Sequence, residues 1–149
     1  MPIHLLDVNV LIALCWSHHQ HHQAANAWFA EGTLGGSGGG WATCPITEMS
    51  FIRLSMNPVS MRSTISTTEA ANGLRNLISH PNHYFWTDEL SLLNPLVLTK
   101  QVRGHRQVTD AYLFALCMHH KGVLATFDRG TLSLAATPEQ RKSIFLIPT

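Results

Sequence analysis

The sequence predicts an α/β fold in which a parallel sheet is covered by helices on both faces. Short apolar runs alternate with longer segments of helical periodicity along the chain, which is the pattern of strand–helix–strand units. The length of 149 residues falls within the range of one compact domain, and 45% of the residues are hydrophobic, enough for a buried core. We therefore expect residues 1–149 to form a single domain.

The first half of the chain predicts two strands and three helices. Residues 3–6 are expected to form a buried strand, and residues 10–16 the helix that follows it. An alanine-rich segment, 20–30, predicts a second helix, and 41–44 a brief strand. Pro45 suits the first turn of a helix over 45–54.

The second half repeats the alternation. Ser66 and Glu69 have the spacing of a capping box, which predicts a helix over 67–78. The clearest helical pattern covers 108–120, and Gly122 is expected to end it in the usual C-terminal position for glycine. Strands are predicted at 84–86, 123–127 and 143–147.

Two further features describe the chain as a whole. The glycine-rich segment 32–40 is predicted to be a flexible surface loop, because it separates a helix from a strand and not two domains. Cys15 and Cys117 lie in apolar runs, so buried, reduced thiols in the cytoplasm are expected. No apolar run approaches the roughly 20 residues of a membrane helix, and the N-terminus lacks the basic region of a signal peptide, so no membrane association is expected.

Acidic residues are scarce, which makes their positions informative. Charged residues make up 13% of the chain, against roughly 25% in typical soluble proteins. The formal net charge of +1 does not indicate nucleic-acid binding by bulk electrostatics, so polyanion binding would need a local basic patch or metal ions.

Four of the acids fall where a parallel sheet gathers its site. Asp7 and Asp128 each follow a predicted strand, while Glu48 and Asp110 lie near the starts of predicted helices. Ligands of open parallel sheets bind beyond the carboxyl ends of the strands. Carboxylates packed there would repel one another unless cations lay among them, and oxygen ligands suit Mg²⁺ or Mn²⁺. The arrangement points to phosphodiester hydrolysis.

Each acid also has an ordinary structural interpretation. Asp7 or Asp128 alone could be a turn residue or helix cap, Asp110 could complement a helix dipole, and Glu48 could be an exposed first-turn acid. Only their joint placement favours a site.

Short polar residues accompany the acids. Asn9 lies two residues after Asp7, and Thr126 two residues before Asp128, a spacing that shares one face on an extended segment. Both are predicted to support the carboxylates, although Asn9 could equally cap the next helix. Thr109 is expected to be a helix cap.

Basic residues near the acids are candidates for contacts with the phosphates of a substrate. Lys100, Arg103, His105 and Arg106 precede Asp110 in sequence, and Arg53 and Arg129 could add phosphate contacts. A solvated charged loop is the alternative interpretation of this segment. The histidines at 18, 19, 21 and 22 are interpreted as a solvated helix start, although His18 and His22 have the i,i+4 spacing of some metal sites.

The chain resembles PIN-domain nucleases, in particular VapC-type toxins of toxin–antitoxin pairs. The matching stretches are LLDVNVLIAL, WATCPITEMSFIRLS, HRQVTDAYLFALCMHHKG and VLATFDRG. In many relatives another acid follows the fourth one closely, but here Arg129 and Gly130 follow Asp128, which leaves one or two metal ions as alternatives.

The resemblance implies a three-layer α/β/α sandwich and Mg²⁺- or Mn²⁺-dependent RNA cleavage. It also implies inhibition by a cognate VapB-type antitoxin and pairing as a homodimer. The family's four acids match Asp7, Glu48, Asp110 and Asp128, and its polar partners match Asn9 and Thr126. These acids are expected to hold the cations while water attacks the phosphodiester, which leaves 5′-phosphate and 3′-hydroxyl ends.

Two rival functions follow from the same residues. A haloacid-dehalogenase-type phosphatase also begins with an Asp after its first strand, but it needs a second Asp where this chain has Asn9. A non-catalytic RNA-binding module of the same fold would usually lack one or more acids, and all four are present.

Overall fold

A parallel sheet forms the centre of the molecule. The computed structural model describes residues 2–32 and 39–149. Within them the strands are ordered β3-β2-β1-β4-β5, and every neighbouring pair is parallel. The strands are β1 (His4–Leu6), β2 (Trp41–Thr43), β3 (His83–Phe85), β4 (Val123–Thr126) and β5 (Ile144–Leu146).

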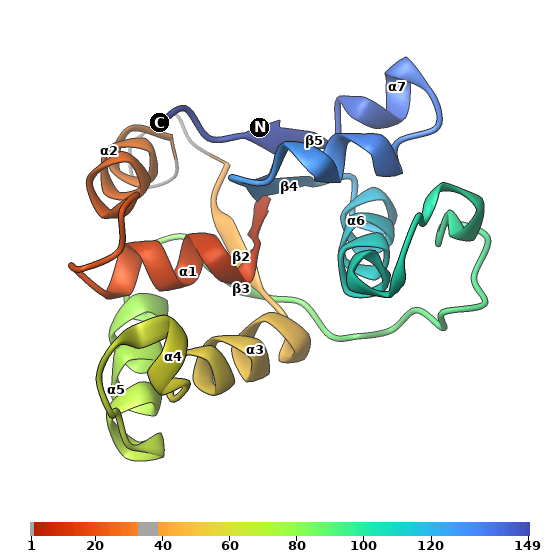
Figure 1. The fold of residues 1–149 in the computed structure, drawn as a ribbon. Helices are drawn as coiled ribbons and strands as arrows, with labels where there is room; N and C mark the ends of the chain where they lie inside the picture. The colour runs from red at the N-terminus through yellow and green to blue at the C-terminus, as the bar shows by residue number, and fades with distance from the viewer. Residues whose placement is uncertain (1, 33–38) are drawn as a thin grey trace.

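Helices cover both faces of this sheet. One face carries α1 (Val8–Cys15), α2 (His22–Gly32), α3 (Pro45–Ser55) and α5 (Thr67–Ile78), and α6 (Val108–His119) lies against the other (Figure 1). The predicted parallel sheet between two helical layers, the α/β/α sandwich, is therefore confirmed. The sequence prediction did not include the short elements α4 (Pro58–Met61), η1 (Thr99–Gln101), η2 (His105–Gln107), η3 (Arg129–Leu134) and α7 (Pro138–Arg141).

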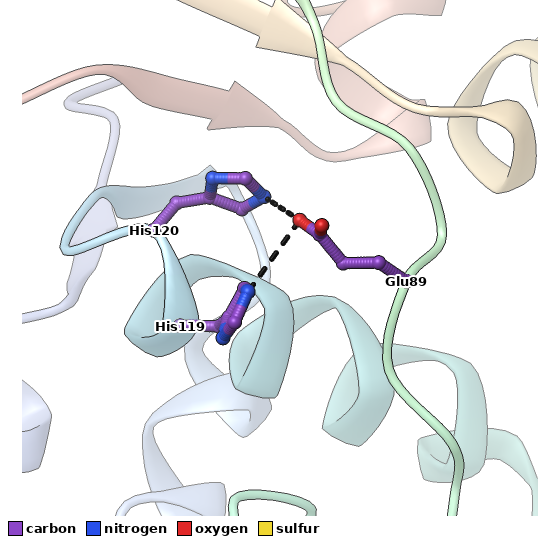
Figure 2. A group of neighbouring side chains, drawn as sticks. All are labelled: Glu89, His119 and His120. Carbon is purple, nitrogen blue, oxygen red and sulfur yellow. Dashed lines mark ion pairs between the residues drawn. The ribbon is translucent and has the colours of Figure 1, made fainter.

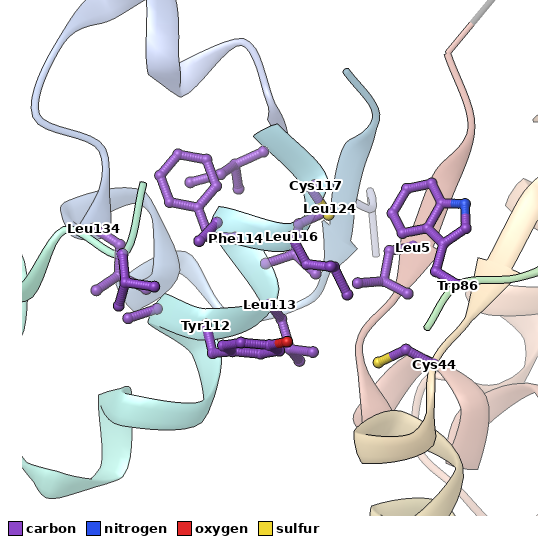
Figure 3. Close-up of a cluster of buried hydrophobic side chains, with 14 of the residues drawn as sticks. Leu5, Cys44, Trp86, Tyr112, Leu113, Phe114, Leu116, Cys117, Leu124 and Leu134 are labelled. Carbon is purple, nitrogen blue, oxygen red and sulfur yellow. The ribbon is translucent and has the colours of Figure 1, made fainter. Parts of the chain in front are cut away.

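The alternation of side chains along the strands produces two cores. Leu5 and Leu124 face α6 and pack with Leu113 and Phe114 (Figure 3). The next residues along the same strands, Leu6 and Ala125, point to the opposite face and join the core beneath α1 and α2. This period of two is the geometry of strands buried on both faces, as in parallel sheets.

Several predicted helix boundaries are confirmed and others are corrected. Helix α5 begins where the capping box placed it, because Ser66 Oγ accepts a hydrogen bond from the Glu69 backbone N at 3.1 Å. Helix α1 begins two residues earlier than predicted, since Asp7 caps it. The prediction that Thr109 caps α6 is wrong: the cap residue is Gln107, without a side-chain hydrogen bond.

The end of α6 differs from the prediction in an informative way. The left-handed residue is Lys121, with φ of 56°, and not Gly122. The Gly122 backbone N donates to Cys117 O at 2.8 Å, and that of Lys121 to Met118 O at 3.2 Å, which together make a Schellman ending. Gly122 is instead required by packing, because a Cβ there would lie 2.6 Å from Ile3 O and 2.7 Å from the Trp86 ring.

The two ends of the glycine-rich segment, residue 32 and residues 39–40, lie within the described ranges. Residues 33–38 lie outside the described ranges, so the prediction of a flexible loop over 32–40 concerns mainly those residues. Gly40 is buried with φ of 106°, and its carbonyl accepts a hydrogen bond from the His4 backbone N at 3.2 Å.

The remaining predictions about the chain concern thiols and membranes. The cysteines are free, as expected, with Cys44 and Cys117 buried and Cys15 half-buried. Burial raises the pKa of the Cys15 and Cys44 thiols to about 11, so neither is a reactive thiolate at neutral pH. Across residues 2–32 and 39–149, no helix combines the length and apolar character that crossing a membrane requires.

Candidate active site

The carboxyl ends of β1 and β4 place two of the predicted acids side by side. These strands are direct neighbours with Leu6 paired to Ala125, so Asp7, which follows β1, lies next to Thr126, the last residue of β4. Thr126 Oγ1 donates a hydrogen bond to Asp7 Oδ2 at 2.9 Å, and the Val8 backbone N donates to Asp7 Oδ1 at 2.7 Å. Asp7 is only 5% exposed, so these two hydrogen bonds replace most of the contacts with water that its carboxylate loses on folding.

The first turn of α6 adds Asp110 to this group. Burial, followed by the charges of Asp7 and Asp128, raises the pKa of Asp110 to about 7. Carboxylates interact this way only when they lie close together in a medium that screens poorly. The structure therefore places Asp7, Asp110 and Asp128, which are distant in sequence, near enough for their charges to interact.

The charge on Asp7 is also disfavoured in the absence of a cation. Burial raises its pKa most, the hydrogen bonds from Thr126 and Val8 lower it, and the charge of Asp128 raises it further. Two neighbouring carboxyl groups are thus held with pKa values above their usual range. A group of neighbouring carboxyl groups of this kind suits a hard divalent cation, because the cation would remove the repulsion.

Asp128 is a helix cap, one of the two interpretations that the sequence left open, and its charge also acts on Asp7 and Asp110. It is the N-cap of η3, with Oδ1 accepting a hydrogen bond from the Gly130 backbone N at 2.8 Å. Its own backbone N donates to Thr126 Oγ1 at 3.1 Å. Thr126 therefore links Asp7 to Asp128 through one hydroxyl, as the sequence analysis expected of a polar partner.

Glu48 lies in a separate hydrogen-bonded network. Thr43 Oγ1 donates to Glu48 Oε2 at 2.6 Å and lies 2.8 Å from His83 Nε2. Since the hydroxyl has one proton, Thr43 accepts from a His83 ring that carries its proton on Nε2. Burial lowers the pKa of His83, and the charge of Glu48 opposes this shift.

The charge of Glu48 is not among the causes that raise the pKa of Asp7 or Asp110. Its convergence with the three aspartates therefore stays a prediction. Neither Thr43 nor His83 was predicted from the sequence, because the two residues are 40 positions apart and carry no local motif.

The family comparison agrees with this geometry. Residues 4–137 match the PIN domain family. The chain belongs to the PIN-domain family. Among similar proteins of Mycobacterium tuberculosis, ribonuclease VapC38 is 43% identical over 135 residues, which cover 88% of this chain and 89% of that protein. Ribonuclease VapC29 is 43% identical over 130 residues, covering 87% and 89%, and ribonuclease VapC39 is 42% identical over 125 residues, covering 83% and 87%.

The predicted resemblance to VapC-type PIN ribonucleases is therefore confirmed. The family match does not favour the alternative phosphatase.

Asn9 occupies a different position in this PIN domain from the one its spacing suggested. It lies within α1 and is exposed. The prediction that Asn9 shares a face with Asp7 on an extended segment is therefore wrong. The alternative that Asn9 caps the helix is also wrong, because Asp7 is the cap. Asn9 lines an open groove of about 790 Å³, together with His18, His19, Leu54 and Arg62. This groove extends from α1 toward α4.

The basic residues are exposed, as phosphate contacts require. Lys100, Arg103, His105 and Arg106 lie on the irregular segment and short 3₁₀ turns that lead into α6, and hence toward Asp110. Arg129 directly follows Asp128 and lines a hollow of about 300 Å³ that also includes His21 and Phe127. Arg53 is exposed in the last turn of α3. Their role in RNA binding stays a prediction.

The histidine cluster is more structured than predicted. His22 Nδ1 lies 2.7 Å from Ala13 O, and the His21 ring stacks on Phe127 with 4.7 Å between ring centroids. His19 Nδ1 accepts a hydrogen bond from the His21 backbone N at 3.0 Å. These contacts hold the turn between α1 and α2. His18 is exposed, as predicted, but it lies in this turn, and α2 begins only at His22.

Proposed function

We propose that this PIN domain is a metal-dependent endoribonuclease that acts as the toxin of a toxin–antitoxin pair. The observation that carries the proposal is the match to the PIN domain family in a chain that brings three aspartates near one another; burial and the charges of Asp7 and Asp128 raise the pKa of Asp110 to about 7. Repulsion among three carboxyl groups destabilises the folded chain, and a bound cation would remove that repulsion. Ribonuclease is the activity named for the VapC relatives.

The donor set suits Mg²⁺ or Mn²⁺. Asp7, Asp110 and Asp128 offer carboxylate oxygens and no imidazole or thiolate, the ligand type that selects these hard ions. Asp7, Asp110 and Glu48 would hold a first ion, and Asp128 would hold a second or orient a water molecule. The bound cation supplies Lewis-acid activation of water and charge neutralisation at the phosphate.

The residues of the chain then have separate tasks. Thr126 donates to Asp7 Oδ2 and the Val8 backbone N donates to Asp7 Oδ1, and these two hydrogen bonds fix the orientation of the carboxylate. Thr43 fixes Glu48 in the same way. Arg103, Arg106, Arg129 and Arg53 would contact phosphates on either side of the scissile bond, because the acidic pocket itself repels RNA.

The same proposal includes two protein partners. A toxin of this kind would be neutralised by a cognate VapB-type antitoxin and would pair as a homodimer. Light scattering on the purified chain tests the dimer, and co-expression with the product of the adjacent reading frame tests the antitoxin. We also propose that residues 1–149 act as one cytoplasmic domain.

An RNA-cleavage assay separates this function from a non-catalytic RNA-binding module. Purified protein is incubated with 5′-labelled single-stranded RNA in Mg²⁺ or Mn²⁺, with and without EDTA. Cleavage that requires the cation and is lost in Asp7→Asn supports the proposal. The exposed acid of α7 gives a matched control, Glu139→Gln, which should cleave normally. RNA binding without cleavage in either cation would leave the scaffold as the function.

Growth of a bacterial host tests the toxin role independently. Expression of the wild type alone should slow growth, and Asp7→Asn should not. Equal growth of both strains, at equal protein levels, would contradict a toxin.

A further inference from the structure

A second group of metal-ligating side chains lies away from the three aspartates. Glu89, His119 and His120 place one ligand atom each within 4.8 Å of one another, the one such group of three or more among the residues that the structure describes. Figure 2 shows both imidazoles, at the C-terminal end of α6, directed at the carboxylate of Glu89. His119 is nine residues beyond Asp110 on the same helix, which is about 14 Å along its axis.

The distances in this group approach those around a shared ion. His120 Nε2 lies 2.8 Å and His119 Nε2 3.5 Å from the same oxygen, Glu89 Oε1. Ligands bound at about 2.0–2.1 Å in a tetrahedral zinc site are roughly 3.3 Å apart. Rotation of the side chains would bring the three ligand atoms, which lie within 4.8 Å of one another, to this separation. The two imidazole rings are nearly perpendicular, at 82°, so their nitrogens approach from different directions.

One ligand is already held in place. The His120 ring stacks on Trp86, with 4.2 Å between centroids and 13° between planes. Trp86 is buried and packs closely against Gly122, so its position is fixed by the core. The Glu89 side chain is 43% exposed and the His119 side chain 41% exposed, which leaves them free to adjust and leaves a path for an ion from solvent.

We propose that Glu89, His119 and His120 form a binding site for Zn²⁺. Two neutral imidazoles and one carboxylate are a ligand set typical of zinc, with a fourth position left for water. The set differs from the all-oxygen ligands of the aspartates, so the two sites would select different ions. Because Glu89 belongs to the irregular segment between β3 and η1, a bound ion would tie that segment to the end of α6.

The alternative for these residues is an ion pair that serves only the helix end. A protonated histidine near the C-terminus of α6 would interact favourably with the helix dipole and with Glu89. This role needs no metal, and it predicts no response of the protein to Zn²⁺.

Zinc titration of matched variants distinguishes the two. Binding of Zn²⁺ is measured by calorimetry, and thermal unfolding is followed with and without Zn²⁺. Both measurements are made on the wild type and on Asp7→Asn, because this variant weakens any binding of Zn²⁺ to the three aspartates. Glu89→Gln and His119→Ala should each reduce the affinity for Zn²⁺ by more than the roughly 10–100-fold typical of losing an outer hydrogen-bond partner. They should also abolish the rise in melting temperature that Zn²⁺ causes.

His18→Ala is the control, because His18 is an exposed histidine outside this group. It should bind Zn²⁺ as the wild type does, and Mg²⁺ should not replace Zn²⁺. Absence of Zn²⁺ binding, or binding that survives Glu89→Gln and disappears in His18→Ala, would overturn the proposal. Mg²⁺-dependent RNA cleavage should be unchanged in Glu89→Gln, so failure here leaves the proposed nuclease function untouched.

Discussion

Thr126 Oγ1 donates a hydrogen bond to Asp7 Oδ2 at 2.9 Å, although 119 residues separate the two in sequence. The same hydroxyl oxygen accepts from the backbone N of Asp128 at 3.1 Å. One buried threonine therefore positions two of the acids of the candidate site.

Replacement of Thr126 by valine should damage both the site and the fold. Valine fills nearly the same volume but leaves Asp7 Oδ2 without its donor, so the free energy of unfolding should fall by about 1–3 kcal/mol. RNA cleavage should fall roughly 10–100-fold, as for other residues that orient metal ligands. Chemical denaturation and initial cleavage rates measure the two effects.

Thr131→Val is the matched control for this change. Thr131 is also buried, but its hydroxyl has no hydrogen-bond partner among the described residues. Its loss should leave stability and cleavage nearly unchanged. Equal effects of Thr126→Val and Thr131→Val would show that the hydrogen bond to Asp7 has no special role.

The raised pKa of Asp110 should make the metal-free protein less stable as the pH rises. The pKa is about 7 in the folded chain, against an ordinary value of 3.8. Stability from the protonated carboxyl is fully present below about pH 4 and is lost as the pH rises through about 7. A difference of this size corresponds to about 4 kcal/mol for a fully buried group. Solvent near this partly exposed carboxyl reduces the expected effect to about 1–2 kcal/mol.

Asp110→Asn should remove that loss. In EDTA at pH 8 the variant should be more stable than the wild type by about 1–2 kcal/mol, although it should no longer cleave RNA. Addition of Mg²⁺ should stabilise the wild type and have little effect on the variant. Urea unfolding at several pH values measures both, with Glu139→Gln as an exposed-acid control. A wild type no less stable than Asp110→Asn at pH 8 would contradict the predicted repulsion.

Glu48 is predicted to contribute less than the aspartates. Its carboxylate is held by Thr43 and does not add to the repulsion around Asp110. Glu48→Gln should therefore raise the Mg²⁺ concentration needed for half-maximal cleavage, with much of the rate recovered at high Mg²⁺. Asp7→Asn should not recover. Cleavage measured over a series of Mg²⁺ concentrations distinguishes the two variants. A complete loss in Glu48→Gln that high Mg²⁺ does not recover would mean that Glu48 is as essential as Asp7.

Local sequence patterns predict some residues of the candidate site and miss the contacts that depend on strand register. Asp7 and Asp128 were found because both follow strands, and parallel strands bring their carboxyl ends to one edge. The Thr43–His83 contact was not found, because it depends on the register between β2 and β3, which no local pattern encodes. Asn9 was misplaced because Asp7 begins α1 immediately, so the chain is already helical at Asn9.

Gly122 shows the same limit at a single position. The sequence predicted a glycine that ends α6 through backbone freedom, whereas the structure assigns the left-handed conformation to Lys121. The reason for Gly122 is contact with Ile3 and Trp86, which are distant in sequence. A close approach of this kind cannot be recognised until the partners are known.

Gly122→Ala should therefore destabilise the protein through crowding. The added methyl group would lie 2.6 Å from Ile3 O and 2.7 Å from the Trp86 ring, and neither a backbone carbonyl of the sheet nor a buried indole can move cheaply. We expect a loss of about 1–3 kcal/mol in the free energy of unfolding. Because the added methyl group would displace Trp86, which stacks on the His120 ring, the variant should also show altered tryptophan fluorescence.

Gly104→Ala is the control, since Gly104 is extended, with φ of −168°, and has no atom within 4 Å of an added Cβ. Its stability should stay the same or rise by up to about 1 kcal/mol. A Gly122→Ala protein as stable as Gly104→Ala would mean that the end of α6 can shift away from β1, and the crowding argument would then be wrong.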